Sequence, residues 1–132
     1  MKFSPLFPMQ PWYFKDLDYF TEEEVLATGC KIHDVDYRLF IALDRLRGKI
    51  GIPFNLHHLT TGIHVEGSYH YKGTAVDGRF LYDPHPNKVI QAAIDCGIKG
   101  IGYYRWGWHF DIRQDCALWK QDEGIYLPMV SK

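Results

Sequence analysis

The sequence lacks three features, each of which would point to a different class of protein. It has no run of about eighteen apolar residues, so no membrane span is expected. Its 15 basic and 16 acidic side chains nearly cancel, so it lacks the basic surface typical of nucleic-acid-binding proteins. Its N-terminal segment is broken by prolines and shows no continuous apolar stretch, so no signal peptide is expected. With these classes excluded, we expect an ordinary globular domain.

Cysteine is too scarce and too widely spaced for a disulfide framework or a thiolate metal site. Three cysteines occur, an odd number, and no two of them form a C-x-x-C pair. We therefore expect buried free thiols at Cys30, Cys96 and Cys116.

Repeats, linkers and low-complexity runs are also absent, so we predict one domain spanning residues 1–132. This length supports a hydrophobic core without staples. Prolines in the first segment predict an extended arm over residues 1–14 that lies on the domain. The aromatic content of 16% favours a core filled with large rings. A cleft that stacks on sugar or peptide is the alternative.

Capping residues, apolar spacing and glycine stops predict three helices and at least four strands. The expected helices are 21–28 starting at the capping box of Thr21, 34–48 capped by Asp34 and ended by Gly48, and 86–96 beginning at Pro86 and stopped by Gly97. The expected strands are 54–60, 75–82, 100–104, 108–113 and an edge strand within 125–130. Helices first, then strands with one inserted helix, predict an α+β fold around a small antiparallel sheet with helices packed on it.

The most specific pattern in the chain is Ser68–Asp77, with His109 on a later strand. An imidazole from His70 and a carboxylate from Asp77 are ligands that zinc accepts, and Gly73 permits the turn between them. With His109 the set has three protein ligands and leaves one position for water, as in catalytic zinc sites. A His-x6-Asp pair alone occurs in many chains that bind no metal, so the interpretation depends on the whole pattern.

Two further side chains flank this pattern. Asp111 lies two residues beyond His109 and points to the same face of its strand. It serves either as the acceptor that orients a ligand histidine or as the general base. Ser68 either forms a hydrogen bond within the loop or helps to hold an oxyanion.

The pattern S-x-H-x-x-G-x-A-x-D … H-x-D resembles the signature of the M15 family of zinc D-Ala-D-Ala carboxypeptidases and related peptidoglycan endopeptidases. Three further passages are similar to the phage and prophage branch of that family. They are residues 19–24 (hydrophobic-F-T/S-x-x-E), residues 43–54 (Leu-x-x-Leu-Arg … Gly-x-Pro) and residues 100–113 (G-x-G-x-Y … H-x-D-x-R). The resemblance covers roughly residues 14–113.

This resemblance implies a hedgehog-like fold with one zinc ion per chain, held by His70, Asp77 and His109. It also implies hydrolysis of an amide bond in peptidoglycan stem peptides, as in a phage lysin. We expect Asp111 to be the general base, with Glu66 as the next candidate. We expect synthesis in the cytoplasm and action at the cell wall, either after release with a partner such as a holin or as part of a virion.

Two departures from the family pattern bear on activity. Many relatives carry an acid three residues before the last histidine as the general base, and Trp106 occupies that position here. Many also carry an arginine where this chain has His64, which we expect to stabilise the oxyanion, with Arg38 or Arg105 as compensating residues. The rival hypothesis is a catalytically weak or inactive zinc-stabilised domain that binds peptidoglycan or belongs to a virion.

Overall fold

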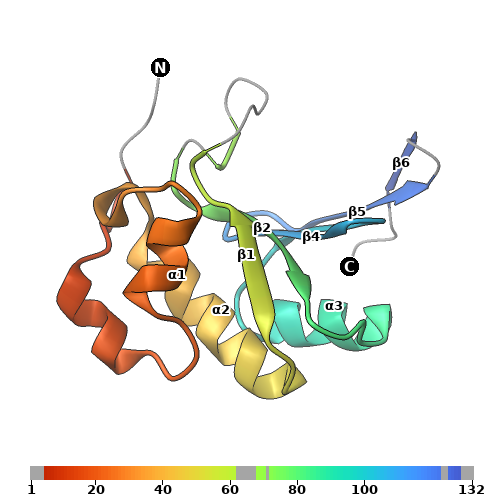
Figure 1. The fold of residues 1–132 in the computed structure, drawn as a ribbon. Coiled ribbons are helices and arrows are strands. Elements are labelled where there is room, and N and C mark those ends of the chain that lie inside the picture. The colour runs from red at the N-terminus through yellow and green to blue at the C-terminus, as the bar shows by residue number, and fades with distance from the viewer. Residues whose placement is uncertain (1–4, 62–67, 71, 123–124, 129–132) are drawn as a thin grey trace.

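The fold is a mixed α+β domain with short helices first and a sheet formed by later segments (Figure 1). It was obtained as a computed structural model, which describes residues 5–61, 68–70, 72–122 and 125–128. The helices are the 3-10 helices η1 (Pro11–Asp16) and η2 (Ile32–Asp34) and the α-helices α1 (Glu22–Ala27), α2 (Tyr37–Ile50) and α3 (Pro86–Asp95). The strands are β1 (Phe54–His58), β2 (Ala75–Phe80), β3 (Gly100–Tyr104), β4 (Gly107–Asp111), β5 (Ala117–Asp122) and β6 (Ile125–Pro128).

One sheet contains all the strands, in the order β1-β2-β4-β3-β5-β6. The α+β class is confirmed, but the expectation of a purely antiparallel sheet is wrong, because β5 pairs with β3 in parallel. The β3–β4 hairpin returns the chain to the level of Gly100, where β3 began. A short connection then brings Ala117 opposite Gly100 on the free edge of β3. The predicted edge strand at the tail is present as β6.

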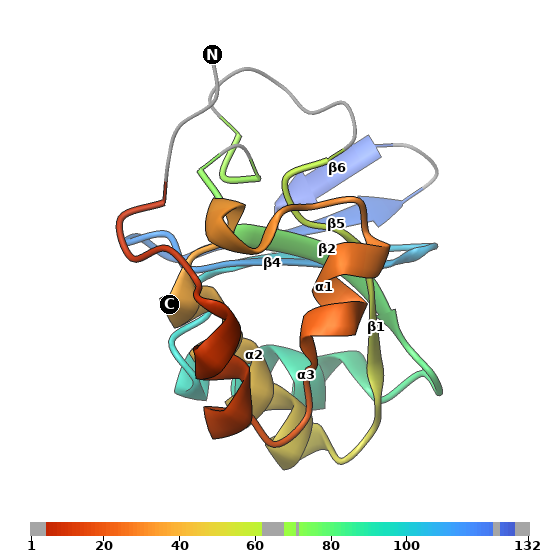
Figure 2. The same ribbon diagram turned by 60° about the vertical axis from the view of Figure 1, so that its left-hand side comes forward.

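The helices α2 and α3 lie on one side of this sheet (Figures 1 and 2). Side chains alternate along each strand, so Trp108 and Phe110 of β4 face the helices and are almost fully buried. The rings of Phe54 and Phe80 pack against Phe110 with centroids 5.4 and 6.5 Å away. The intervening residue, His109, is therefore turned to the opposite face of the sheet. The packing of Trp108 and Phe110 against the helices thus determines that His109 points to the opposite face of the sheet.

The ends of α2 differ from the sequence expectation. Asp34 belongs to η2, and Asp36 is the N-cap, its carboxylate accepting the N–H of Arg38 at 2.9 Å. Gly48 does not end the helix; its missing Cβ makes room for the ring of Tyr19. The stop is Gly51, at φ 76°, in the left-handed region that glycine enters without strain.

The other element boundaries are close to their predictions. The capping box of Thr21 starts α1, and Pro86 starts α3. The N-terminal arm is not extended to residue 14 as expected, because Pro11–Asp16 forms a 3-10 helix after an extended Gln10. The arm is tied to the domain because the N–H of Met9 donates to the carbonyl of Val35 at 2.8 Å.

The structure also bears on the expected free thiols and on the expected lack of a membrane span. Cys30 and Cys96 are buried free thiols, whereas Cys116 is only partly buried because it lies in the connection before β5. Within the described residues, no helix is long and apolar enough to cross a membrane.

Gly73 is required by both its conformation and its surroundings. Its φ of 74° lies in the left-handed region, its carbonyl accepts the N–H of Asp36 at 2.8 Å, and a Cβ would collide with the carbonyl of Asp34. Gly51 has a similar φ of 76° but open space around the position of a Cβ. A substitution at Gly51 therefore tests backbone strain alone, whereas one at Gly73 adds a steric clash to the same strain.

We predict that Gly51→Ala lowers the free energy of unfolding by about 1 kcal/mol, from strain alone. Gly73→Ala should lower it by about 2–4 kcal/mol, because overpacking is added to the same strain. Urea unfolding followed by circular dichroism measures both. Equal losses in the two variants would show that the loop around residue 73 adapts to a Cβ.

Candidate metal centre

Hydrogen bonds hold both the ring and the backbone of His70 in place. It lies in the turn just before β2 and is 3% exposed. Its ring Nδ1 lies 2.7 Å from the carbonyl of Leu59, which can only accept, so Nδ1 carries a proton and donates it. Its backbone N–H donates to Oγ of Ser68 at 3.1 Å. The remaining ring nitrogen, Nε2, is thereby aimed away from the backbone.

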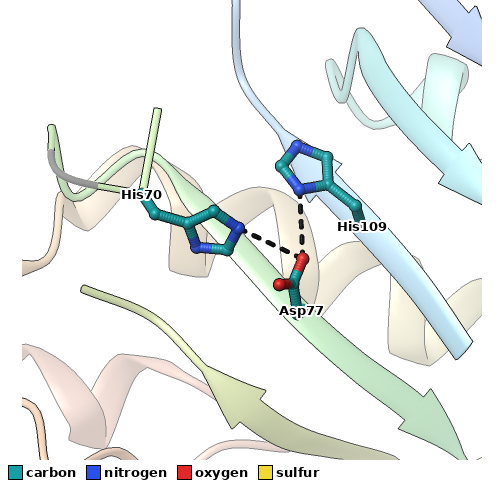
Figure 3. Close-up of side chains that lie close together, drawn as sticks. All are labelled: His70, Asp77 and His109. Carbon is teal, nitrogen blue, oxygen red and sulfur yellow. Dashed lines mark hydrogen bonds and ion pairs between the residues drawn. The ribbon is translucent and has the colours of Figure 1, made fainter. Parts of the chain in front are cut away.

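Asp77 and His109 are brought together by the register of the sheet. Asp77 on β2 stands directly opposite His109 on β4 in the antiparallel pair. Oδ1 of Asp77 lies 3.1 Å from Nε2 of His70 and 3.1 Å from Nδ1 of His109. Figure 3 shows the three side chains converging from a loop and two neighbouring strands on this one point.

These three side chains fit a small cation such as zinc. Each offers one ligand atom, and the three atoms lie within 4.8 Å of one another. Ligands about 2.1 Å from a tetrahedral zinc ion are roughly 3.4 Å apart, close to the two measured separations of 3.1 Å. Two imidazoles and one carboxylate are a donor set that zinc accepts, and they leave a fourth position open.

Asp111 holds His109 from the far side of its ring. Oδ2 of Asp111 lies 2.6 Å from Nε2 of His109, which donates to it. Asp111 is fully buried, and Arg113 binds it through three donors: its backbone N–H at 3.0 Å, Nε at 2.8 Å and Nη2 at 2.7 Å. A proton held on Nε2 leaves Nδ1 of His109 facing Asp77 as the ligand atom.

The charges of the cluster stabilise one another. Burial by itself raises the pKa of Asp111, but hydrogen bonds from Arg113 and His109 outweigh it and lower that pKa to about 2. Burial also raises the pKa of Asp77, and hydrogen bonds from His109 and His70 more than offset it and hold the pKa below its usual range. Burial lowers the pKa of His109, but its bonds to Asp111 and Asp77 raise it overall. A cation binding here displaces the proton between Asp77 and His109.

Two glycines of β3 make room for the side chains around His109. A Cβ at Gly100 would collide with the carboxylate of Asp111, and one at Gly102 would collide with the indole of Trp119. Trp119 comes from β5 and its ring lies 5.1 Å from the ring of His109. The two positions are therefore glycines because the side chains of Asp111 and Trp119, which flank His109, occupy the space that a Cβ would need.

The structure gives the sequence candidates different roles. Of the two roles open to Ser68, the bond within the loop is present, to the N–H of His70. Asp111 has the orienting role, since its oxygens accept from His109 and Arg113. Arg38 is bound instead to the buried carboxylate of Asp36 through Nε at 3.0 Å and Nη2 at 2.9 Å.

Two further positions that the sequence singled out lie outside the cluster of ligands. Arg105 and Trp106 are in the turn of the β3–β4 hairpin, where the ring of Trp106 stacks on Tyr104. His64 and Glu66 lie outside the described residues.

Sequence reasoning missed three contributors to this centre. Arg113 could have been found from its i+2 spacing to Asp111 on an extended segment, although a guanidinium there is equally suited to solvent. Trp119 carried no usable signal, because β5 itself was not predicted. The acceptor for His70 is the backbone carbonyl of Leu59, and a backbone atom leaves no mark in a sequence.

Comparison with protein-family models, with curated proteins and with solved structures found no match. The centre is therefore argued from its own geometry and donor chemistry.

Replacing Asp77 tests the ligand set. We predict that Asp77→Asn lowers zinc affinity by more than the roughly 10–100-fold that loss of an outer partner costs, because a ligand charge is removed. His85→Asn is the matched control: it removes a histidine that does not belong to the ligand cluster, and asparagine still caps α3. Competition against a chromogenic chelator gives both affinities. Equal zinc affinity in Asp77→Asn and wild type would exclude Asp77 as a ligand.

Replacing Arg113 tests the support behind His109. Arg113→Lys keeps the charge but loses the paired donation to Asp111, so we expect zinc affinity to fall roughly 10–100-fold. Arg45→Lys, on an exposed position of α2, should leave zinc affinity unchanged. The same chelator competition measures both variants, and an unchanged affinity in Arg113→Lys would contradict an orienting role for the pair.

Proposed function

We propose that this protein is a zinc-dependent peptidase that hydrolyses an amide bond in peptidoglycan stem peptides, with a hedgehog-like fold of the M15 type. The observation that carries the proposal is the convergence of His70, Asp77 and His109 on one point, with each histidine tied to an acceptor through its other nitrogen. The resemblance of residues 68–77 and 100–113 to the M15 pattern supports the same reaction. Delivery by a holin or within a virion belongs to the proposal.

The residues of the centre divide the work of such a reaction. A zinc ion bound here supplies Lewis-acid polarisation of the scissile carbonyl and acidifies a water molecule. His70 and His109 are fixed in ring orientation by Leu59 and Asp111, which sets the direction of their ligand nitrogens. Asp111 keeps a proton on Nε2 of His109 rather than removing one from water, because its oxygens are already bound by His109 and Arg113. The general base is then Glu66.

A second candidate function is a zinc-stabilised domain that binds peptidoglycan or serves in a virion without catalysis. The commitment of Asp111 to His109 and Arg113 favours it, as does Trp106 at the position where relatives carry an acid. In this case zinc contributes to stability and not to turnover. Zinc removal abolishes cleavage under the first candidate function but only lowers the melting temperature under the second.

The deciding experiment incubates zinc-loaded protein with purified peptidoglycan, with and without a chelator, and identifies released fragments by mass spectrometry. We expect chelator-sensitive release of a new amine terminus, retained by His85→Asn and lost by Asp77→Asn. Glu66→Gln should lower the rate by about 10²–10⁴-fold if Glu66 is the base. A protein that binds zinc, melts at lower temperature without it and cleaves no wall type would instead establish the second candidate.

A further inference from the structure

A histidine of β1 lies in the same row of the sheet as the metal centre. Residues that pair directly on neighbouring antiparallel strands place their side chains on the same face. Asp77 on β2 pairs with His109 on one side and with His58 of β1 on the other. His58 therefore belongs to the face that carries the centre. From β1 to β5, the paired residues of this row are His58, Asp77, His109, Gly102 and Trp119.

An extra residue in β1 turns His58 to this face. Leu56 pairs with Gly78 and packs on the core from the helix-facing side. Strict alternation would send His58, two residues further on, to the same side. The register instead shifts by one residue after Leu56, so that His57 and His58 together oppose the single residue Asp77. Such bulges are common beside active sites because they redirect a side chain.

Burial and hydrogen bonding agree with this position of His58. Its side chain is exposed, whereas the next residue, Leu59, is fully buried. The carbonyl of Leu59 accepts the Nδ1–H of His70, so the end of β1 is tied to the centre. Opposed residues in an antiparallel pair have Cβ atoms about 4.5–5.5 Å apart, a separation that an imidazole can bridge. The ring of His58 can therefore reach a molecule bound where His70, Asp77 and His109 converge.

Among the described residues, the β1 side of the centre is more exposed than the β5 side. On the β5 side, the partly buried ring of Trp119 lies 5.1 Å from the ring of His109. On the β1 side, Asn55 and Arg79 oppose each other further along the β1–β2 pair, and both are exposed. A peptide that reaches the centre over β1 and β2 meets polar side chains, of which His58 is the one beside the ligands.

We propose that His58 contacts the substrate, donating a ring N–H to the carbonyl oxygen of the scissile amide as that oxygen gains negative charge. This inference rests on the proposed function for the reaction. A neutral imidazole carries one N–H, so the contact needs no change in protonation. Donors aimed at developing charge are among the largest contributions to catalysis. The sequence favoured His64 for a similar role, but the register puts His58 beside Asp77.

Binding of acetohydroxamate to the zinc-loaded protein tests this contact without turnover. This small anion chelates zinc through two oxygen atoms and presents a charged oxygen to a donor beside the ion. We expect its dissociation constant, measured by titration calorimetry, to rise roughly 10–100-fold in His58→Phe, because a hydrogen bond to a charged group is lost. Zinc affinity, measured by chelator competition, should stay unchanged, because His58 is not one of the three clustered ligands. Where peptidoglycan is cleaved, the rate should fall about 10²–10³-fold.

His57→Phe is the matched control, because a ladder without the extra residue would put His57 opposite Asp77 in place of His58. This variant should bind acetohydroxamate and zinc as the wild type does. Circular dichroism checks that both variants keep the fold. A loss of acetohydroxamate affinity in His57→Phe instead of His58→Phe would show the regular register and overturn the inference.

The outcomes separate this inference from the proposed function. Loss of acetohydroxamate affinity confined to His58→Phe supports the contact, even if the protein cleaves no peptidoglycan. Unchanged affinity for acetohydroxamate, or an unchanged cleavage rate, in His58→Phe overturns the contact and leaves the peptidase standing. A fall in zinc affinity as large as that in Asp77→Asn also overturns it, because His58 would then be a ligand. Absence of acetohydroxamate binding to the zinc-loaded wild type overturns it as well.

Discussion

The register between β2 and β4 is the constraint on which the centre depends. Asp77 faces His109 across this pair, and Val76 faces Phe110 on the other side of the sheet. A slip of one residue would turn the ligands towards the helices and the apolar residues towards solvent. The rings of Phe54, Phe80 and Phe110 oppose such a slip because they fill the helix-facing side. The packing of the hydrophobic core on one face of the sheet thus determines the geometry of the candidate metal centre on the other face.

Two carboxylates among the described residues are fully buried, and each is compensated locally. Asp111 is fully buried and depends on Arg113 and His109, whereas Asp36 is fully buried and depends on Arg38 and on backbone N–H groups. Removing one partner of such a pair leaves an uncompensated buried charge, which costs far more than the pair gains. These carboxylates therefore act by fixing geometry: that of Asp36 anchors the arm through the N–H of Phe7, and that of Asp111 orients His109.

Local signals predicted the parts of the fold that local interactions determine. The capping box of Thr21 and the proline at the start of α3 were readable from short spacings, as was the pairing of His70 with Asp77, whereas His109 was included from the longer pattern of the resemblance. Asp34 and Asp36 are two equally suitable caps in sequence, and the choice between them is made by a tertiary contact, the bond from the N–H of Asp36 to Gly73. The parallel strand β5 depends on an edge that exists only after β3 and β4 have paired. Trp119, whose ring lies beside His109, could not be predicted for that reason.

In the proposed peptidase, the charge balance of the centre bears on the kind of substrate that would bind. With neutral imidazoles, Asp77 and Asp111 contribute two negative charges and Arg113 one positive charge, so a divalent cation leaves the centre with a net charge of plus one. Without Arg113 the same cation would be fully neutralised by the two carboxylates. A net positive centre with little exposed surface attracts electron-rich carbonyl oxygens and nearby carboxylates more strongly than a neutral one does. In the proposed reaction Arg113 would therefore do more than orient Asp111: by cancelling its charge, it would leave a bound cation with unneutralised charge for the substrate.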